Sequence, residues 1–131
     1  MIPKKTVILV EDNSYDMEII IRNLKDHFEI IDCFDKVEDL VDAIKNRKSK
    51  IPDVVILDLG LPRSWGYETF EKALPIVNEC CIVVLTGLND DEVGKKAIMN
   101  GALDYMSKDD IFSEEIAKRI GFSLIRRDKI A

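Results

Sequence analysis

Short apolar runs alternate along this chain with longer stretches in which apolar residues recur every three or four positions. Nearly continuous apolar runs, rich in β-branched residues, are typical of parallel strands that are covered on both faces. The alternation of such strands with helices predicts an α/β fold in which five strands and five helices follow one another. The predicted strands are Lys5 to Val10, Glu29 to Phe34, Val54 to Asp58, Cys81 to Thr86 and Asp104 to Ser107.

The stretches between the strands carry apolar stripes at helical spacing. Apolar residues at i, i+3, i+4 and i+7 lie on one face of a helix, so each stripe predicts the face that packs on the sheet. The stripes are Met17, Ile20, Ile21 and Leu24 in the first helix, Val37, Leu40, Val41 and Ile44 in the second, and Ile116, Ile120 and Leu124 in the last, which should begin near Ser113.

Helix ends are predicted from capping residues, glycine and proline. Gly101 suits the residue after a helix. Pro75 should end a third helix that begins near Trp65, because a proline in the interior of a helix costs about 3 kcal/mol. Two pairs have the spacing of capping boxes and predict helix starts, namely Asp35 with Glu38 and Asn89 with Glu92.

Composition narrows the class of protein. The 131 residues, 47% of them hydrophobic, suit a single domain that extends over residues 1–131. The formal charge is −6, which argues against direct binding of nucleic acid. No apolar run approaches the length of about 20 residues that a membrane span needs, and the beginning of the chain does not resemble a signal peptide. We therefore expect a cytoplasmic protein that contacts no membrane.

The cysteines and the only histidine are not expected to do chemistry. Cys33, Cys80 and Cys81 lie in or beside apolar stretches without CxxC spacing, so we expect reduced structural thiols and no bound metal. His27 falls near the end of the first predicted helix, away from the candidate site described next. It is expected at the surface.

Polar residues end or directly follow four of the five predicted strands. In a doubly wound sheet, ligands bind outside the carboxyl ends of the strands, so these side chains should converge. Each has an ordinary structural alternative, such as a helix cap, a turn or a solvated charge. Together, however, three carboxylates would repel one another unless a cation such as Mg²⁺ lay among them. The converging residues are Glu11, Asp12, Asp58, Thr86 and Lys108.

Four segments, "ILVEDN", "ILDLGLP", "VVLTG" and "GALDYMSKDD", resemble the receiver domains of two-component response regulators in order and spacing. The resemblance implies a flavodoxin-like (βα)5 three-layer sandwich with sheet order 2-1-3-4-5. It also implies a protein that accepts a phosphoryl group from a histidine kinase or a histidine phosphotransfer protein. Such a protein is a signalling switch that assists its own phosphorylation and dephosphorylation, and we do not expect an enzyme.

The resemblance assigns roles to the acids. Asp58 matches the aspartate that is phosphorylated, on a strand that would serve as a rigid support for this nucleophile. Asp12 and Asp58 match direct Mg²⁺ ligands, and the carbonyl of Gly60 matches a backbone ligand. Glu11 matches a ligand that acts directly or through water.

The resemblance also implies a route for the signal. Thr86 and Lys108 match the pair that holds the phosphoryl oxygens, and Thr86 with Tyr105 matches the switch that couples the site to the surface of the fourth helix, fifth strand and fifth helix. A downstream protein should bind this surface, and a phosphorylation-linked homodimer is left open. Gly94, inside the fourth helix, either makes that helix easier to shift or allows close packing against a neighbour.

The chain departs from the family pattern at a few positions. Glu11 replaces the commoner aspartate, and Asp109 follows Lys108 where many receivers have a proline after a cis bond. We expect a trans bond here, because a cis bond before a residue other than proline costs about 2.5–4 kcal/mol. Gly60 and Leu88 place no polar side chain where water would attack the acyl phosphate, which predicts a long-lived phosphorylated state.

Other classes of protein fit less well. A flavin-binding electron carrier needs a phosphate loop after the first strand, whereas "EDNSYD" would repel phosphate. A hydrolase with an aspartyl nucleophile would show a D-x-D pattern, and an NTPase would show G-x-x-x-x-G-K-[ST]; both are missing from the sequence. The remaining alternative is a degenerate receiver that acts as a scaffold without phosphorylation.

Overall fold

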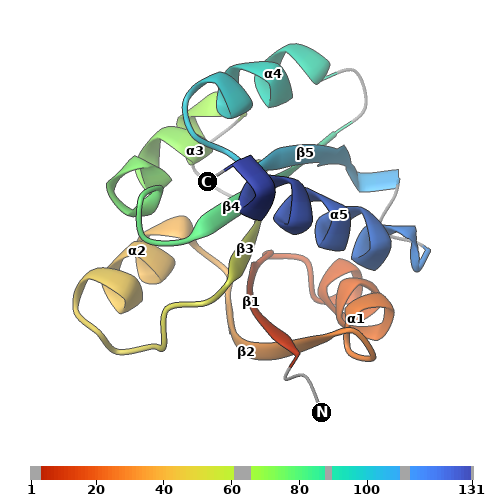
Figure 1. Cartoon of the computed structure of the whole chain (residues 1–131). Helices are drawn as coiled ribbons and strands as arrows, with labels where there is room; N and C mark the ends of the chain where they lie inside the picture. Colours follow the sequence, from red (N-terminus) through yellow and green to blue (C-terminus); the bar gives the residue numbers. More distant parts are fainter. Residues whose placement is uncertain (1–3, 61–65, 88–89, 110–112, 131) are drawn as a thin grey trace.

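A parallel sheet lies between two layers of helices in the computed structural model, which describes residues 4–60, 66–87, 90–109 and 113–130 (Figure 1). The strands confirm the predicted positions, except that the second begins one residue earlier than predicted. They are β1 (Lys5–Val10), β2 (Phe28–Phe34), β3 (Val54–Asp58), β4 (Cys81–Thr86) and β5 (Asp104–Ser107).

The strand order is β2-β1-β3-β4-β5, and every neighbouring pair is parallel, as the flavodoxin-like prediction requires. The strand order reverses at β1, because the chain passes from β1 outward to β2 and then returns to β3 on the other side of β1. A crevice for ligands forms at such a point, at the carboxyl ends of the strands. Here these ends belong to β1 and β3.

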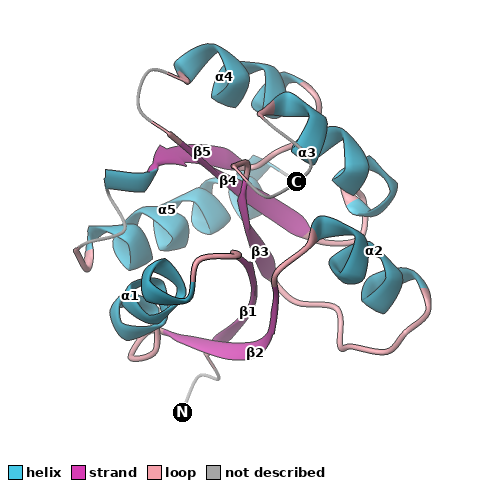
Figure 2. Ribbon diagram, turned by 180° about the vertical axis from the view of Figure 1, so that it is seen from behind, coloured by secondary structure: helices cyan, strands magenta, loops and turns pink. Residues whose placement is uncertain are grey.

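Four α-helices and the 3-10 turn η1 connect the strands, and a fifth α-helix follows the last strand. Figures 1 and 2 show α1 and α5 on one face of the sheet and α2, α3 and α4 on the other. Among the described residues, no helix combines the length and apolar character needed to cross a bilayer. The helices are α1 (Ser14–Leu24), α2 (Val37–Lys45), α3 (Tyr67–Ala73), α4 (Asp91–Met99) and α5 (Glu115–Ile130), and the 3-10 turn η1 is Leu74–Ile76.

The central strands bury side chains on both faces of the sheet. Because side chains alternate along a strand, Val7 and Leu9 of β1 pack toward the layer of α1 and α5, while Ile8 and Val10 pack toward α2, α3 and α4. All four side chains have no exposed surface. The same alternation divides β3 and β4 between the two cores, which explains why these strands are apolar without interruption.

The predicted helical stripes form the other side of each core. Ile20 and Leu24 of α1 and Ile120 of α5 are buried in the first core, and Leu40 and Ile44 of α2 are buried in the second. The stripe predictions are therefore confirmed. This packing fixes the helix that follows β1, and with it the loop that carries Glu11 and Asp12.

The predicted helix ends are partly confirmed. Gly101 follows the C-cap of α4 with φ of +119°, a backbone conformation that favours glycine. Pro75 lies in η1, directly after α3 ends, as predicted.

The prediction that Asp35 begins a capping box is wrong. The N-cap of α2 is Lys36, whose side chain makes no capping hydrogen bond. β2 extends to Phe34, so Asp35 lies in the turn between the two elements. Trp65 and Asn89 lie outside the described residues.

Gly94 packs against the ring of Tyr105 on β5. A Cβ atom at position 94 would lie 2.5 Å from Cγ of Tyr105 and closer still to Cδ2. The glycine therefore allows α4 and β5 to approach closely, which was the second of the two interpretations drawn from the sequence. Gly121 on α5 differs, because a Cβ atom there would meet nothing within 4 Å.

Replacing Gly94 and Gly121 by alanine should change stability in opposite directions. Gly94→Ala forces the ring of Tyr105 to move, and we expect it to lower the free energy of unfolding by about 1–3 kcal/mol. Gly121→Ala should raise it by up to about 1 kcal/mol, because alanine loses less backbone entropy than glycine in a helix. Urea denaturation measures both values. A Gly94→Ala variant as stable as the parent would show that the contact with Tyr105 is not tight.

Candidate functional site

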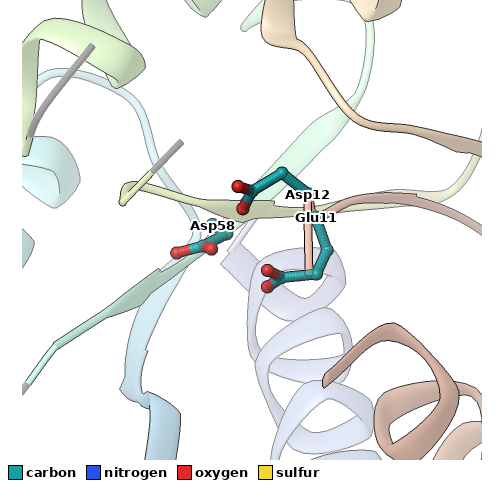
Figure 3. A group of neighbouring side chains, drawn as sticks. All are labelled: Glu11, Asp12 and Asp58. Atoms are coloured by element: carbon teal, nitrogen blue, oxygen red, sulfur yellow. The ribbon is translucent and has the colours of Figure 1, made fainter. Parts of the chain in front are cut away.

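Three carboxylates meet at the carboxyl ends of β1 and β3 (Figure 3). Glu11 and Asp12 directly follow β1, and Asp58 is the last residue of β3. One oxygen from each carboxylate can be chosen so that all lie within 4.8 Å of one another. Glu11 and Asp58 are only 1% and 2% exposed, whereas Asp12 is exposed. Acids predicted from separate strand ends are thus brought together.

The backbone around Asp58 fixes one of its oxygens and leaves the other available. Its Oδ1 accepts a hydrogen bond from the amide of Gly60 at 3.0 Å. The amide of Leu59 donates to the carbonyl of Leu85 in β4, which continues the sheet past the end of β3. The second oxygen, Oδ2, is buried and accepts no hydrogen bond. Apart from the ion pair with Lys108 described below, this oxygen is available to an electrophile or a cation.

Glu11 is also only partly satisfied. Its Oε1 accepts a hydrogen bond from the amide of Asn13 at 3.1 Å, and its buried Oε2 accepts none. Burial, followed by the charge and proximity of Asp58, raises the pKa of Glu11 to about 8, although Lys108 and the Asn13 amide act in the opposite direction. Near neutral pH the carboxyl group therefore tends to hold a proton unless a cation takes its place.

Lys108 supplies the positive charge of the site. Its Nζ lies 2.9 Å from Oδ2 of Asp58 and 3.2 Å from Oε2 of Glu11, but neither approach has hydrogen-bond geometry. The ammonium instead donates to Oε1 of Glu11 at 3.3 Å and to Oδ2 of Asp16 at 3.2 Å. Burial alone would lower the pKa of Lys108, but Asp58, Glu11 and Asp16 together raise it above its ordinary value.

Asp16 was not predicted as a residue of this site. It lies in the first turn of α1, where its amide donates to the side chain of the N-cap, Asn13, at 3.0 Å. Asp16 is an acidic residue in the first turn of the helix that follows the Glu11–Asp12 loop, so it lies at the same end of the sheet as these acids. An acidic residue at the start of the first helix was the signal that sequence reasoning could have used.

Thr86 and Tyr105 lie on the neighbouring strands β4 and β5. Thr86 is 2% exposed, and its hydroxyl donates to the carbonyl of Met106 at 3.4 Å, toward β5. Tyr105 is half-buried, and its carbonyl accepts a hydrogen bond from Arg119 of α5 at 3.0 Å. Thr86 is thus bonded to β5, and Tyr105 of β5 is bonded to α5, while the role of both residues as a switch remains a prediction.

The positions that depart from the family pattern have defined surroundings where the structure describes them. The bond between Lys108 and Asp109 is trans, as predicted, since the described residues contain no cis bond. The amide of Asp109 donates to the hydroxyl of Ser107 at 3.2 Å, a bond that proline could not make. Gly60 is exposed, and a metal bond to its carbonyl remains a prediction. Leu88 lies outside the described residues.

The donor set fits a hard divalent cation. The three acids offer only oxygen, which Mg²⁺ prefers. Two of their oxygens, Oε2 of Glu11 and Oδ2 of Asp58, are buried without a hydrogen bond, and Lys108 can balance only one charge when all three acids are ionised. A cation among these oxygens would satisfy both and would reduce the repulsion.

A sequence profile of the response regulator receiver domain matches residues 7–120. This chain belongs to that family. It is 30% identical over 104 residues to the chemotaxis protein CheY of Halobacterium salinarum, covering 79% of this chain and 84% of that protein. The predicted family is therefore confirmed, and the acid cluster described above lies where the receiver motifs predicted it.

Two further comparisons agree with this assignment. The chain is 29% identical over 119 residues to the hybrid signal transduction histidine kinase D of Dictyostelium discoideum, which covers 89% of this chain but only 7% of that kinase. The BeF3-activated DrrB receiver domain is similar in structure, with a TM-score of 0.70, 26% identity, and coverage of 92% of this chain and 97% of that one. Receiver domains thus occur in this family both as small proteins and within large ones.

The cysteines and His27 lie apart from the acid cluster. Cys33, Cys80 and Cys81 are free thiols, and Cys80 is buried. Burial raises the pKa of Cys80 to about 12, which keeps this thiol protonated. His27 is exposed and precedes β2, whose first residues lie at the opposite end of the sheet from the acids. The prediction of a surface histidine is confirmed.

Proposed function

We propose that this receiver domain accepts a phosphoryl group on Asp58 from the phosphohistidine of a histidine kinase or a histidine phosphotransfer protein. The observation that carries the proposal is Oδ2 of Asp58, a buried oxygen without a hydrogen bond that lies 2.9 Å from Nζ of Lys108. An anionic nucleophile next to a fixed ammonium is suited to attack a phosphoryl group, whose charge the ammonium offsets.

The transfer conserves atoms and charge. A carboxylate oxygen of Asp58 forms a bond to phosphorus, and the P–N bond of the phosphohistidine breaks. The electron pair of that bond stays on the imidazole nitrogen. Lys108 donates to an oxygen of the transferred group, and the hydroxyl of Thr86 turns from Met106 to donate to another. The burial of Asp58 limits the access of water to the new acyl phosphate.

Mg²⁺ is the proposed cofactor. Asp12, Asp58 and the carbonyl of Gly60 would hold it, with Glu11 bound directly or through water. When bound, the ion neutralises charge on the transferred phosphoryl group and orients its oxygens. The extra methylene of Glu11 lets its carboxyl group reach back toward Lys108, to which it is hydrogen-bonded.

The alternative of a scaffold that is never phosphorylated fits the site less well. A scaffold has no need for buried oxygens without hydrogen bonds, and it could replace the acids with groups that satisfy each other. Glu11, Asp58 and Lys108 are instead held close together without full hydrogen bonding. A kinase partner also agrees with the similarity to a hybrid histidine kinase. On this proposal the protein acts as a signalling switch and not as an enzyme on a separate substrate.

Replacing Asp58 by asparagine should abolish phosphorylation and leave the fold intact. The change removes the nucleophile and one negative charge but keeps the shape of the side chain. We expect acetyl phosphate with Mg²⁺ to label the parent and not Asp58→Asn, as measured by intact-protein mass spectrometry. Asp26→Asn is the matched control, because Asp26 is exposed between α1 and β2. Equal labelling of the parent and Asp58→Asn would refute the assignment, and an unlabelled parent would favour the scaffold.

We also propose that the signal leaves through the surface of α4, β5 and α5. A phosphoryl group shifts a conformational equilibrium only through contacts that are better in one state, and a hydrogen bond from Thr86 provides such a contact. If Thr86 turns away from Met106, space opens beside β5 that the ring of Tyr105 can enter. That ring now packs on Gly94, so its movement would change the packing of α4.

Beryllofluoride, which imitates the phosphoryl group, tests this route. With Mg²⁺ present, we expect amide NMR shifts both at the loops around Asp58 and throughout residues 90–107. Tyr105→Ala should keep the shifts near Asp58 and lose most of those in α4, because the ring carries the change. Shifts confined to the loops around Asp58 in the parent would rule out signalling through this surface.

A further inference from the structure

Among the described residues, Asp16 is the one carboxylate paired with Lys108 that does not belong to the acid cluster. The group of oxygens suited to a metal contains Glu11, Asp12 and Asp58 but not Asp16. Asp16 nevertheless accepts a hydrogen bond from Nζ of Lys108 at 3.2 Å, and its side chain is only 21% exposed. Its contact with Lys108 therefore does not compete with a cation.

The hydrogen bonds of Lys108 determine where its ammonium points. It donates to Oε1 of Glu11 and to Oδ2 of Asp16, while Oδ2 of Asp58, although 2.9 Å away, receives no hydrogen bond. Asp16 thus helps to keep the ammonium beside the nucleophilic oxygen, with which it forms an ion pair.

Lys108 needs such a partner because its side chain is long and 29% exposed. Without an anchor, the four-carbon stem could turn into solvent, since a lysine side chain loses much rotamer freedom when it is held. A cation bound by Glu11 and Asp58 would draw these carboxylates away from Lys108. Asp16 would then be the anion that remains.

We propose that Asp16 is a positioning residue that holds Lys108 over Asp58 for phosphoryl transfer. The inference rests on the proposed function and adds a residue of α1 to the site. Because α1 is fixed by the burial of Ile20 and Leu24, the anchor has a rigid support. Asp16 itself makes no contact with the reacting atoms in this proposal.

The test compares Asp16→Asn with Glu18→Gln, which removes an exposed charge from the same helix. We expect Asp16→Asn to slow labelling by acetyl phosphate about threefold to tenfold at saturating Mg²⁺. Glu18→Gln should have no effect, and Asp16→Glu should restore part of the rate. In a Lys108→Met background, Asp16→Asn should cause no further slowing, because the residue acts only through Lys108.

A second measurement follows Lys108 without phosphorylation. The heteronuclear NOE of its ¹⁵Nζ reports how firmly the ammonium is held, and it should fall in Asp16→Asn but not in Glu18→Gln. Labelling of Asp16→Asn at or above the parent rate, or an unchanged NOE, would overturn the positioning role while Asp58 remains the phosphoacceptor. If the parent is not labelled at all, the proposed function fails, and the NOE alone decides whether Asp16 holds Lys108.

Discussion

Repulsion among Glu11, Asp12 and Asp58 is the constraint on which the rest of this site depends. The sheet places three carboxylates at one edge and buries two of them, so the site needs a proton on Glu11 or compensating positive charge to be stable. Lys108 provides part of it and contacts both buried acids. Two buried oxygens remain without a hydrogen bond, and on the proposed function this imbalance favours the uptake of a cation and then of an anionic phosphoryl group.

The fold supplies the rigidity that this arrangement needs. Each central strand is anchored in two cores, so β1 and β3 cannot separate to relieve the repulsion between the acids at their ends. The register of β1 against β3 fixes Val10 beside Leu57, one residue before Glu11 and Asp58 respectively. The proposed transmission of the signal requires mobility instead. The element proposed to move is β5, an edge strand whose half-buried Tyr105 packs on the glycine of α4.

The sequence was sufficient to predict the strands, because uninterrupted apolar runs are needed wherever both faces of a sheet are covered. It also identified the residues of the acid cluster, since the carboxyl ends of parallel strands share one edge. It failed at Asp35, where capping spacing could not show how far β2 extends. It also missed Asp16, whose partner Lys108 is 92 residues away. For Gly94 the sequence allowed two interpretations, and only the packing of Tyr105 favours one of them.

Calorimetric titration of the unphosphorylated protein with Mg²⁺ tests the central claim most directly. We expect one ion per chain, with Asp12→Asn and Asp58→Asn each weakening binding by roughly tenfold or more. Burial and then Asp58 raise the pKa of Glu11 to about 8, although the Asn13 amide and Lys108 act in the opposite direction. Binding at pH 7 should therefore release protons, and affinity should rise with pH until about pH 8. Absence of binding at millimolar Mg²⁺, or binding unaffected by both variants, would contradict the claim that these acids form a cation site.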